Sequence, residues 1–323
     1  MLTSSNRDLK IDGLKCLMIF LVVLGHLTYN DWGIGVNRII YSFHMPVFVF
    51  LSGYLTSQNT NKEKQHRWYK RTLLIYLIAQ FAHILLTIGL EYGKMILEKE
   101  AFDPSVISWR VIISPYLALW YLLCLIYWRF SVWNLFPKTN DIALIIISLG
   151  LAFLSGIIPV DHDFSFQRAF SFYPYFVMGL VFRKRGLIKK LIRLPYVYAL
   201  IGLISGLIAA RFLPTYMPKL HYLDWHNMIL RIIQTGLGTF LCLCVIRATY
   251  IYAVEKLAKY GAYTLWIYIG HTYLIRIGEK AFPYLGISLN LIEALLLAAL
   301  YCFTIYLAAD LYQSHRRKKL ERT

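Results

Sequence analysis

The sequence predicts an all-α, polytopic membrane protein with about ten transmembrane helices, because its composition and its apolar pattern both lie outside the soluble range. Of its 323 residues, 58% are apolar and 16% are charged, whereas about a quarter of a soluble globular chain is charged. Apolar stretches long enough to span about 30 Å of hydrocarbon as a helix recur along the chain with short polar interruptions. Because backbone groups in lipid must satisfy their own hydrogen bonds, we expect each stretch to be a helix.

The expected spans use almost the entire chain. In order they are 11–31, 36–57, 71–92, 111–130, 140–160, 166–183, 194–212, 227–252, 262–282 and 286–312. No segment is left for a second domain. We therefore expect residues 1–323 to form a single membrane domain, with 1–10 as a cytoplasmic N-terminus and 313–323 as a basic cytoplasmic tail.

The basic residues lie between the apolar spans, and their distribution predicts the orientation. With the N-terminus in the cytoplasm, most of the 34 Lys and Arg residues fall on the cytoplasmic side, which is the positive-inside pattern, and an even number of spans returns the C-terminus to that side. The formal net charge of +17 therefore reflects topology, and no nucleic-acid recognition module accompanies it. We expect a multi-pass protein of the inner (plasma) membrane, in contact with the lipid bilayer and not with nucleic acid.

The cysteines indicate neither disulfides nor a metal site. All five lie in expected spans, and the only close pair is separated by one residue. These residues are Cys16, Cys124, Cys242, Cys244 and Cys302. We expect no bound metal.

Ionisable side chains inside the spans are costly in lipid and are therefore functional candidates. Lys15 and His26 are eleven residues apart, close to three helical turns, so they share one face of the first span. His44 lies in the neighbouring span. An imidazole with a pKa near 6.5 can accept a proton from a hydroxyl group at neutral pH. This chemistry suits His26 as a general base with His44 beside it.

The two other histidines within expected spans, His271 and His83, are interpreted differently from each other. His271 shares a face of its span with Thr264 and Tyr268, and this face must point into protein or water. A lone histidine within a membrane more often forms hydrogen bonds between helices than it catalyses a reaction, and we keep this interpretation for His83.

A cationic cluster precedes the third span. Arg67, Lys70 and Arg71 lie where a phosphate-rich ligand would enter from the cytoplasm. The same residues also serve as a topology signal, and composition does not separate the two readings. No Walker or Rossmann glycine pattern is present.

Several motifs occur in a specific order along the chain. They are Asp12-Gly-Leu-Lys15 followed by Gly25-His26, Ser42-Phe-His-Met-Pro-Val-Phe48, Leu51-Ser-Gly-Tyr54, Leu119-Trp-Tyr-Leu122, Phe172-Tyr-Pro-Tyr-Phe176 with Gly179, and Gly261 with Thr264-Leu265, Tyr268 and His271. This ordered set resembles the integral membrane acyltransferase family 3, particularly its fucose-4-O-acetylase-like branch. The resemblance extends from residue 7 to about residue 310.

The resemblance implies an O-acyltransferase that moves an acyl group, usually acetyl, from acyl-CoA to a hydroxyl group of a cell-surface or lipid-linked saccharide. It implies His26 as the catalytic histidine and Lys15 where many members carry arginine. We expect His44 to be a second catalytic residue, which orients the reacting groups or stabilises the developing oxyanion. The family's basic signature at the third helix matches Arg67, Lys70 and Arg71 imperfectly, and these residues with Lys15 would bind the donor, acetyl-CoA or another acyl-CoA. Trp120, Tyr268 and His271 would line the substrate cavity, and no metal is required.

Two other functions remain open from the sequence. About ten helices with polar groups at membrane depth and proline-interrupted spans also describe a solute or glycan transporter or exporter. An inactive relative that serves as an assembly partner is a further possibility, since histidines alone do not prove turnover.

Overall fold

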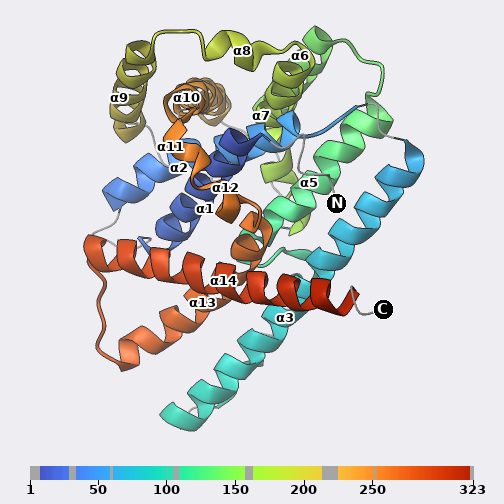
Figure 1. Cartoon of the computed structure of the whole chain (residues 1–323). Coiled ribbons are helices and arrows are strands. Elements are labelled where there is room, and N and C mark those ends of the chain that lie inside the picture. The colour runs from blue at the N-terminus through green and yellow to red at the C-terminus, as the bar shows by residue number, and fades with distance from the viewer. Residues whose placement is uncertain are drawn as a thin grey trace. The chain divides into compact units, whose positions relative to one another are not determined.

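The computed structural model describes residues 8–28, 34–58, 61–99, 101–104, 109–156, 163–212, 225–250 and 252–320. The regular structure in these ranges is entirely helical, and they contain no strand (Figure 1). The predicted all-α class is therefore confirmed. The helices are α1 (Leu9–Leu27), α2 (Ile34–Tyr54), α3 (Lys62–Glu98), α4 (Arg110–Ile113), α5 (Trp120–Phe130), α6 (Asp141–Leu154), α7 (Phe166–Lys184), α8 (Leu187–Leu191), α9 (Tyr196–Phe212), α10 (Trp225–Thr249), α11 (Tyr252–Glu255), α12 (Ala258–Gly261), α13 (Thr264–Tyr284) and α14 (Leu291–Leu320). The 3₁₀ turns η4 (Leu117–Leu119) and η6 (Asp163–Ser165) and the π-helix η5 (Ser131–Leu135) complete them.

Each expected span overlaps a helix, but the boundaries differ. The span expected at 111–130 is wrong as one helix, because α4 ends before Pro115 and the chain resumes with η4 and α5. Ser114 has an extended backbone, which is the conformation that a following proline favours. The tail expected from residue 313 continues α14 as far as Leu320. Predicted span residues 29–31, 157–160 and 251, and the terminal residues 1–7 and 321–323, lie outside the described residues.

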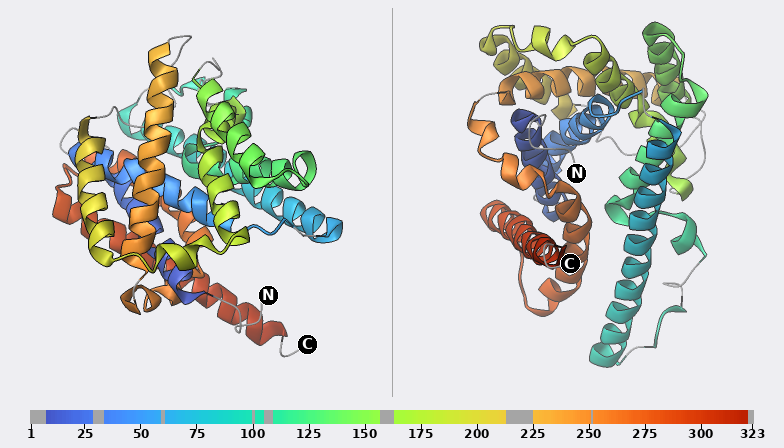
Figure 2. Two further views of the ribbon diagram at one scale, coloured as in Figure 1. Left: turned by 90° about the horizontal axis from the view of Figure 1, so that it is seen from above. Right: turned by 45° about the vertical axis from the view of Figure 1, so that its right-hand side comes forward.

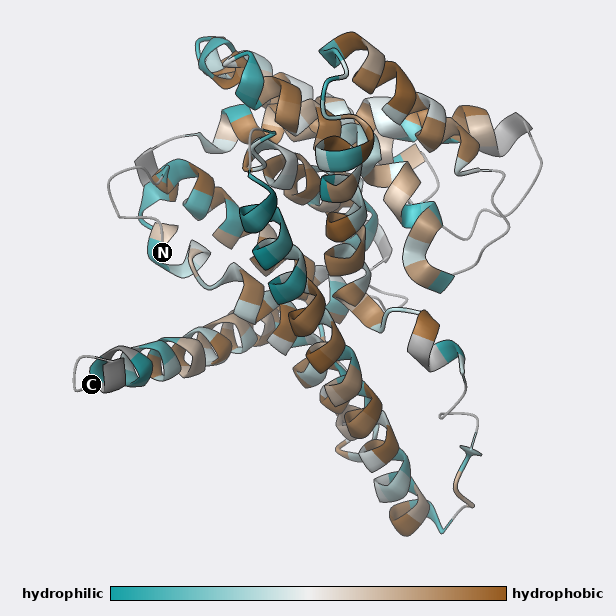
Figure 3. Ribbon diagram, turned by 90° about the vertical axis from the view of Figure 1, so that its right-hand side faces the viewer, coloured by the Kyte–Doolittle hydropathy of each residue, from teal (hydrophilic) through white to brown (hydrophobic). Residues whose placement is uncertain are grey.

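Three of the described helices are long and apolar enough to cross a bilayer. They are Lys62–Glu98, Met228–Thr249 and Leu291–Arg316, and the shorter helices Asp141–Leu154 and Tyr196–Phe212 are also apolar. In Figure 3 the long α3 passes from hydrophilic first turns into a hydrophobic stretch. Leu74, Ile78 and Phe81 of this stretch are more than half exposed, as expected for side chains that face lipid. The protein is a membrane protein; the number of crossings and the sides of the termini stay predictions.

The chain divides into two compact units, each built from separate segments. Unit 1 comprises residues 1–48, 191–213 and 240–323, and unit 2 comprises 49–190 and 214–239. In unit 1, α1 packs against α11, α12, α13 and α14; Figures 1 and 2 show α1 in dark blue, α11 to α13 in orange and α14 in red. In unit 2, α7 packs against α5 and α6, and α3 packs against α5.

Glycines permit the closest helix crossings inside each unit. In unit 1, a Cβ added at Gly13 of α1 would overlap the carbonyl oxygen of Val254, and one added at Gly261 would overlap that of Asp12. Both backbones therefore approach as closely as glycine allows. Unit 2 has the same arrangement between the end of α2 and α7, where Gly53 meets the Phe176 carbonyl oxygen and Gly179 meets that of Phe50.

Candidate functional site

His26 lies in the last turn of α1, and the beginning of α2 holds that turn in place. The Gly25 carbonyl oxygen accepts a hydrogen bond of 2.7 Å from the Asn37 side-chain amide and one of 3.3 Å from the Thr28 hydroxyl. Asn37 and Thr28 are both buried. These bonds satisfy a carbonyl that the end of a helix would otherwise leave without an intrahelical partner. As a result, the backbone next to His26 is fixed by two side chains.

The ring of His271 lies directly beside that of His26. Their centroids are 5.5 Å apart, with 38° between the ring planes. His271 is fully buried in α13, whereas His26 is partly exposed. Tyr268, one turn earlier on α13, has its ring centroid 6.1 Å from that of His271 and is also buried. The structure thus brings together three of the residues that the sequence singled out.

Hydrogen bonds fix the tautomers of the two buried histidines of unit 1. Nδ1 of His271 lies 2.9 Å from the Ile267 carbonyl oxygen, and Nδ1 of His44 lies 2.7 Å from the Ile40 carbonyl oxygen. A carbonyl oxygen only accepts, so Nδ1 carries the proton in both rings. In the neutral imidazole the lone pair then resides on Nε2. Each ring therefore presents its basic nitrogen away from its own helix backbone.

Tyr41 links His26 to His44. Its ring centroid is 6.4 Å from that of His26, edge-on at 80°, and 4.8 Å from that of His44 at 69°. Tyr41 was not among the residues predicted from the sequence. Its position three residues before His44, on the same face of α2, is a signal that could have identified it.

Lys15 forms an ion pair within its own motif. Its ammonium nitrogen lies 2.5 Å from a carboxylate oxygen of Asp12, which is only 4% exposed. A phosphate that approached Lys15 would have to compete with this carboxylate. The nearby Lys10 pairs with Glu255 at 3.7 Å, so the cytoplasmic end predicted for α1 carries paired charges.

The cationic cluster predicted for the donor lies in unit 2. Arg67, Lys70 and Arg71 are exposed on the first turns of α3. Between them, Trp68 packs on the guanidinium of Arg129, whose central carbon is 4.1 Å from the Trp68 ring centroid. Arg129 also lies 5.4 Å from the ring centroid of Trp133 in η5. We call Trp68, Arg129 and Trp133 the Arg129 box. It holds in place the first turns of α3, which carry the cationic cluster.

Trp120 is packed on its own neighbours in unit 2. Its ring stacks on Phe172 with centroids 5.3 Å apart, and the guanidinium of Arg168 lies 5.2 Å from its centroid. The predicted site residues therefore form two sets. Lys15, His26, His44, Tyr268 and His271 belong to unit 1, and Arg67, Lys70, Arg71 and Trp120 belong to unit 2.

Comparison with known proteins identifies the family. A family model described as an acyltransferase domain matches residues 8–313, nearly the whole chain. The chain belongs to acyltransferase family 3. Among curated proteins it is similar to the nodulation protein NolL of Sinorhizobium fredii, with 45% identity over 62 residues, or 17% of each chain. The nodulation protein NolL of Mesorhizobium japonicum is 42% identical over 62 residues, again 17% of each chain. No solved structure matches.

Part of the acyltransferase family 3 motif pattern serves packing. Four motif glycines lie at the close helix crossings described above: Gly13, Gly53, Gly179 and Gly261. Asp12 of the first motif pairs with Lys15. His26, His44, Tyr268 and His271, by contrast, are brought together around one cluster of rings. The motifs therefore combine residues that position helices with residues that form one ring cluster.

Sequence reasoning missed several polar residues of this family member. Asn37 and Tyr41 hold the His26 region, Arg129 lies in the aromatic box, and Arg231 of α10 is only 1% exposed. A single arginine in an apolar stretch is itself a functional signal that could have identified Arg231. Within the described ranges, no group of three or more His, Cys, Asp or Glu side chains is arranged to hold a metal ion.

Proposed function

We propose that this member of acyltransferase family 3 is a membrane-bound O-acyltransferase of the plasma membrane. It moves an acetyl group from acetyl-CoA to a hydroxyl group of a cell-surface or lipid-linked saccharide. Family membership supports acyl transfer. The observation that carries the proposal is the partly exposed imidazole of His26 at the end of α1, with the buried imidazole of His271 against it. Because the similarity to the nodulation proteins covers 17% of their length, it supports no choice of saccharide.

In the proposed reaction, His26 acts as the general base. One of its ring nitrogens takes the proton of the acceptor hydroxyl as the oxygen attacks the carbonyl carbon of the thioester. The new C–O ester bond forms and the C–S bond breaks. The imidazolium then returns the proton to the departing sulfur, so that the products are the O-acyl saccharide and free CoA thiol.

His271 and His44 assist unequally in this scheme. The Ile267 carbonyl holds His271 in the tautomer whose Nε2 has the lone pair, and its ring is in contact with His26. It is therefore placed to stabilise the imidazolium that forms on His26. His44 acts through Tyr41, which touches both rings, and so positions His26 instead of sharing its proton.

For the donor, we propose that Arg67, Lys70 and Arg71 attract the phosphates of acyl-CoA. Their exposure on α3 supports this role. Lys15 contributes less in this scheme, because Asp12 neutralises it. Trp120 stays a proposed cavity residue; its contacts with Phe172 and Arg168 orient its ring.

The test incubates purified full-length protein with labelled acetyl-CoA and candidate lipid-linked or polymeric glycans, and locates the label by mass spectrometry. His26→Ala is expected to lower turnover by about 10²- to 10⁴-fold, the usual contribution of a general base. His315→Ala, which changes an exposed histidine of α14, is the matched control and should leave turnover unchanged. Retained turnover in a well-folded His26→Ala protein would remove His26 from this role. Transport of glycan into vesicles without consumption of thioester would favour the transporter instead.

A further inference from the structure

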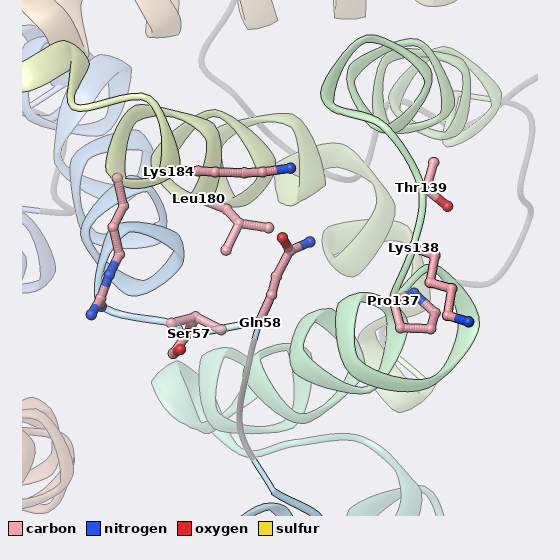
Figure 4. Close-up of a pocket in the computed structure, with 9 residues that line it drawn as sticks. Ser57, Gln58, Pro137, Lys138, Thr139, Leu180 and Lys184 are labelled. Carbon is pink, nitrogen blue, oxygen red and sulfur yellow. The ribbon is translucent and has the colours of Figure 1, made fainter.

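Unit 2 contains a polar cavity away from its packed core. Its volume is 410 Å³, and three segments line it: the residues after α2, the connection between η5 and α6, and the end of α7. The lining residues are Thr56, Ser57, Gln58, Pro137, Lys138, Thr139, Leu180, Arg183 and Lys184. In Figure 4, Gln58 and Lys184 point toward one another across the cavity, with Lys138 and Thr139 on the other wall.

Hydrogen bonds from its neighbours hold one wall of the cavity rigid. The Thr56 hydroxyl donates to the Ser52 carbonyl oxygen at 2.7 Å and accepts from Nε of Arg129 at 3.2 Å. The indole N–H of Trp133 donates to the Ser57 carbonyl oxygen at 2.7 Å. The wall is therefore preorganised by the same Arg129 box that anchors the cationic turns of α3.

The cavity is electropositive. Lys138, Arg183 and Lys184 line it, and none of its lining residues is acidic. A carboxylate beside it, that of Asp141, accepts from Lys184 at 2.8 Å and from Arg185 at 2.6 Å. Lys184 and Arg185 thus share this carboxylate, and Lys138 and Arg183 add two further positive charges to the lining. The Lys138 ammonium is directed outward in Figure 4, and its flexible stem allows it to turn toward a bound anion.

The lining groups match a phosphate group. Arg183 donates one of its five N–H groups to the Tyr54 carbonyl oxygen at 3.1 Å, which fixes the guanidinium at the cavity edge. Hydroxyl and amide groups of Ser57, Gln58 and Thr139 add neutral donors. Charged donors bind phosphate oxygens with the stronger class of hydrogen bond. All three lining segments are also connections that the sequence predicts on the cytoplasmic side.

We propose that this cavity is a binding site for a phosphate group of a ligand that arrives from the cytoplasmic side. The nucleotide end of acyl-CoA and the headgroup of an anionic lipid share this chemistry. The nucleotide assignment rests on the proposed function. The phosphate site itself does not, because its charge and shape are properties of unit 2.

The experiment measures binding without turnover. Full-length protein in phosphatidylcholine nanodiscs is titrated with adenosine 3′,5′-bisphosphate by calorimetry. The double variant Lys138→Gln/Lys184→Gln is expected to bind about tenfold more weakly, since it removes two charge-assisted contacts. Ser57→Trp, which fills the cavity without a change of charge, is expected to weaken binding similarly. Lys190→Gln, an exposed lysine of α8 outside the cavity, is the matched control and should bind like the wild type.

A second arm separates the two ligand sources. Nanodiscs that contain phosphatidylglycerol are analysed by native mass spectrometry for retained lipid. Loss of retention in the double variant, with no bisphosphate binding by the wild type, assigns the site to lipid. If the double variant and Ser57→Trp keep wild-type melting temperatures, bisphosphate affinity and lipid retention, the phosphate site is overturned. Bisphosphate binding without any acyl transfer would instead retain the site and reject the proposed function.

Discussion

The two units treat charge in opposite ways. In unit 1, the charges of α1 are neutralised locally, since Lys15 pairs with Asp12 and Lys10 pairs with Glu255, and the site consists of histidine and tyrosine rings. In unit 2, cations gather around an open cavity with a carboxylate beside it. Proton transfer needs a basic nitrogen shielded from competing charges, whereas attraction of an anion needs unneutralised positive charge. The comparison therefore supports the proposed acid–base chemistry in unit 1 and the proposed anion binding in unit 2.

The largest expected effect concerns the ring cluster of unit 1. His271→Gln is expected to lower turnover by about 10²-fold, because it removes the imidazole that stabilises charge on His26. His44→Gln is expected to have a smaller effect, since His44 touches His26 through Tyr41. Turnover of both variants is compared at matched melting temperature. A larger loss in His44→Gln would reverse the roles proposed for the two histidines.

The next largest effect concerns the close helix crossings at glycines, which occur inside each of the two units. Gly13→Ala and Gly179→Ala are each expected to destabilise the protein by about 1–3 kcal/mol, because the new Cβ overlaps a backbone carbonyl that cannot move by itself. Gly150→Ala is the control, because no atom lies within 4 Å of its added Cβ. Alanine should stabilise that helix by about 0.5–1 kcal/mol. Unfolding in detergent measures all three, and unchanged stability in Gly13→Ala would disprove the close crossing of α1 and α11.

The smallest expected effect concerns the negative charge beside the cavity of unit 2. Asp141→Asn removes the carboxylate beside the cavity and leaves Lys184 and Arg185 unpaired. Asp141 itself is buried, but its two cationic partners are half exposed to solvent, which screens the pair, so the stability should fall by only about 1 kcal/mol and bisphosphate affinity should rise by up to about fivefold. The gain should disappear at high salt, because salt screens exposed charges. Weaker binding in this variant would show that Asp141 orients the cations instead of neutralising them.

Much of the fold could be predicted from the sequence because hydropathy records burial in lipid directly. Every expected span overlaps a helix, but α3 extends beyond 71–92 at both ends. Its first turns are charged and begin at the cap residue Asn61, so an apolar window cannot detect them. The interruption at Pro115 was readable from the proline itself, since proline lacks the backbone N–H that a helix requires.

The sequence by itself determined the all-helical membrane class, the family and the identity of His26 and His271 as candidates. The class follows from composition and the candidates from spacing along single helices, whereas the family follows from the resemblance of an ordered set of motifs; all are local properties of the chain. Only the tertiary structure decided that His271 lies against His26, that Tyr41 links His26 to His44, and that three connections enclose a cationic cavity. Such contacts join segments far apart in the chain, and they depend on which helix faces pack together, a choice that glycine crossings and buried hydrogen bonds make after the helices have formed.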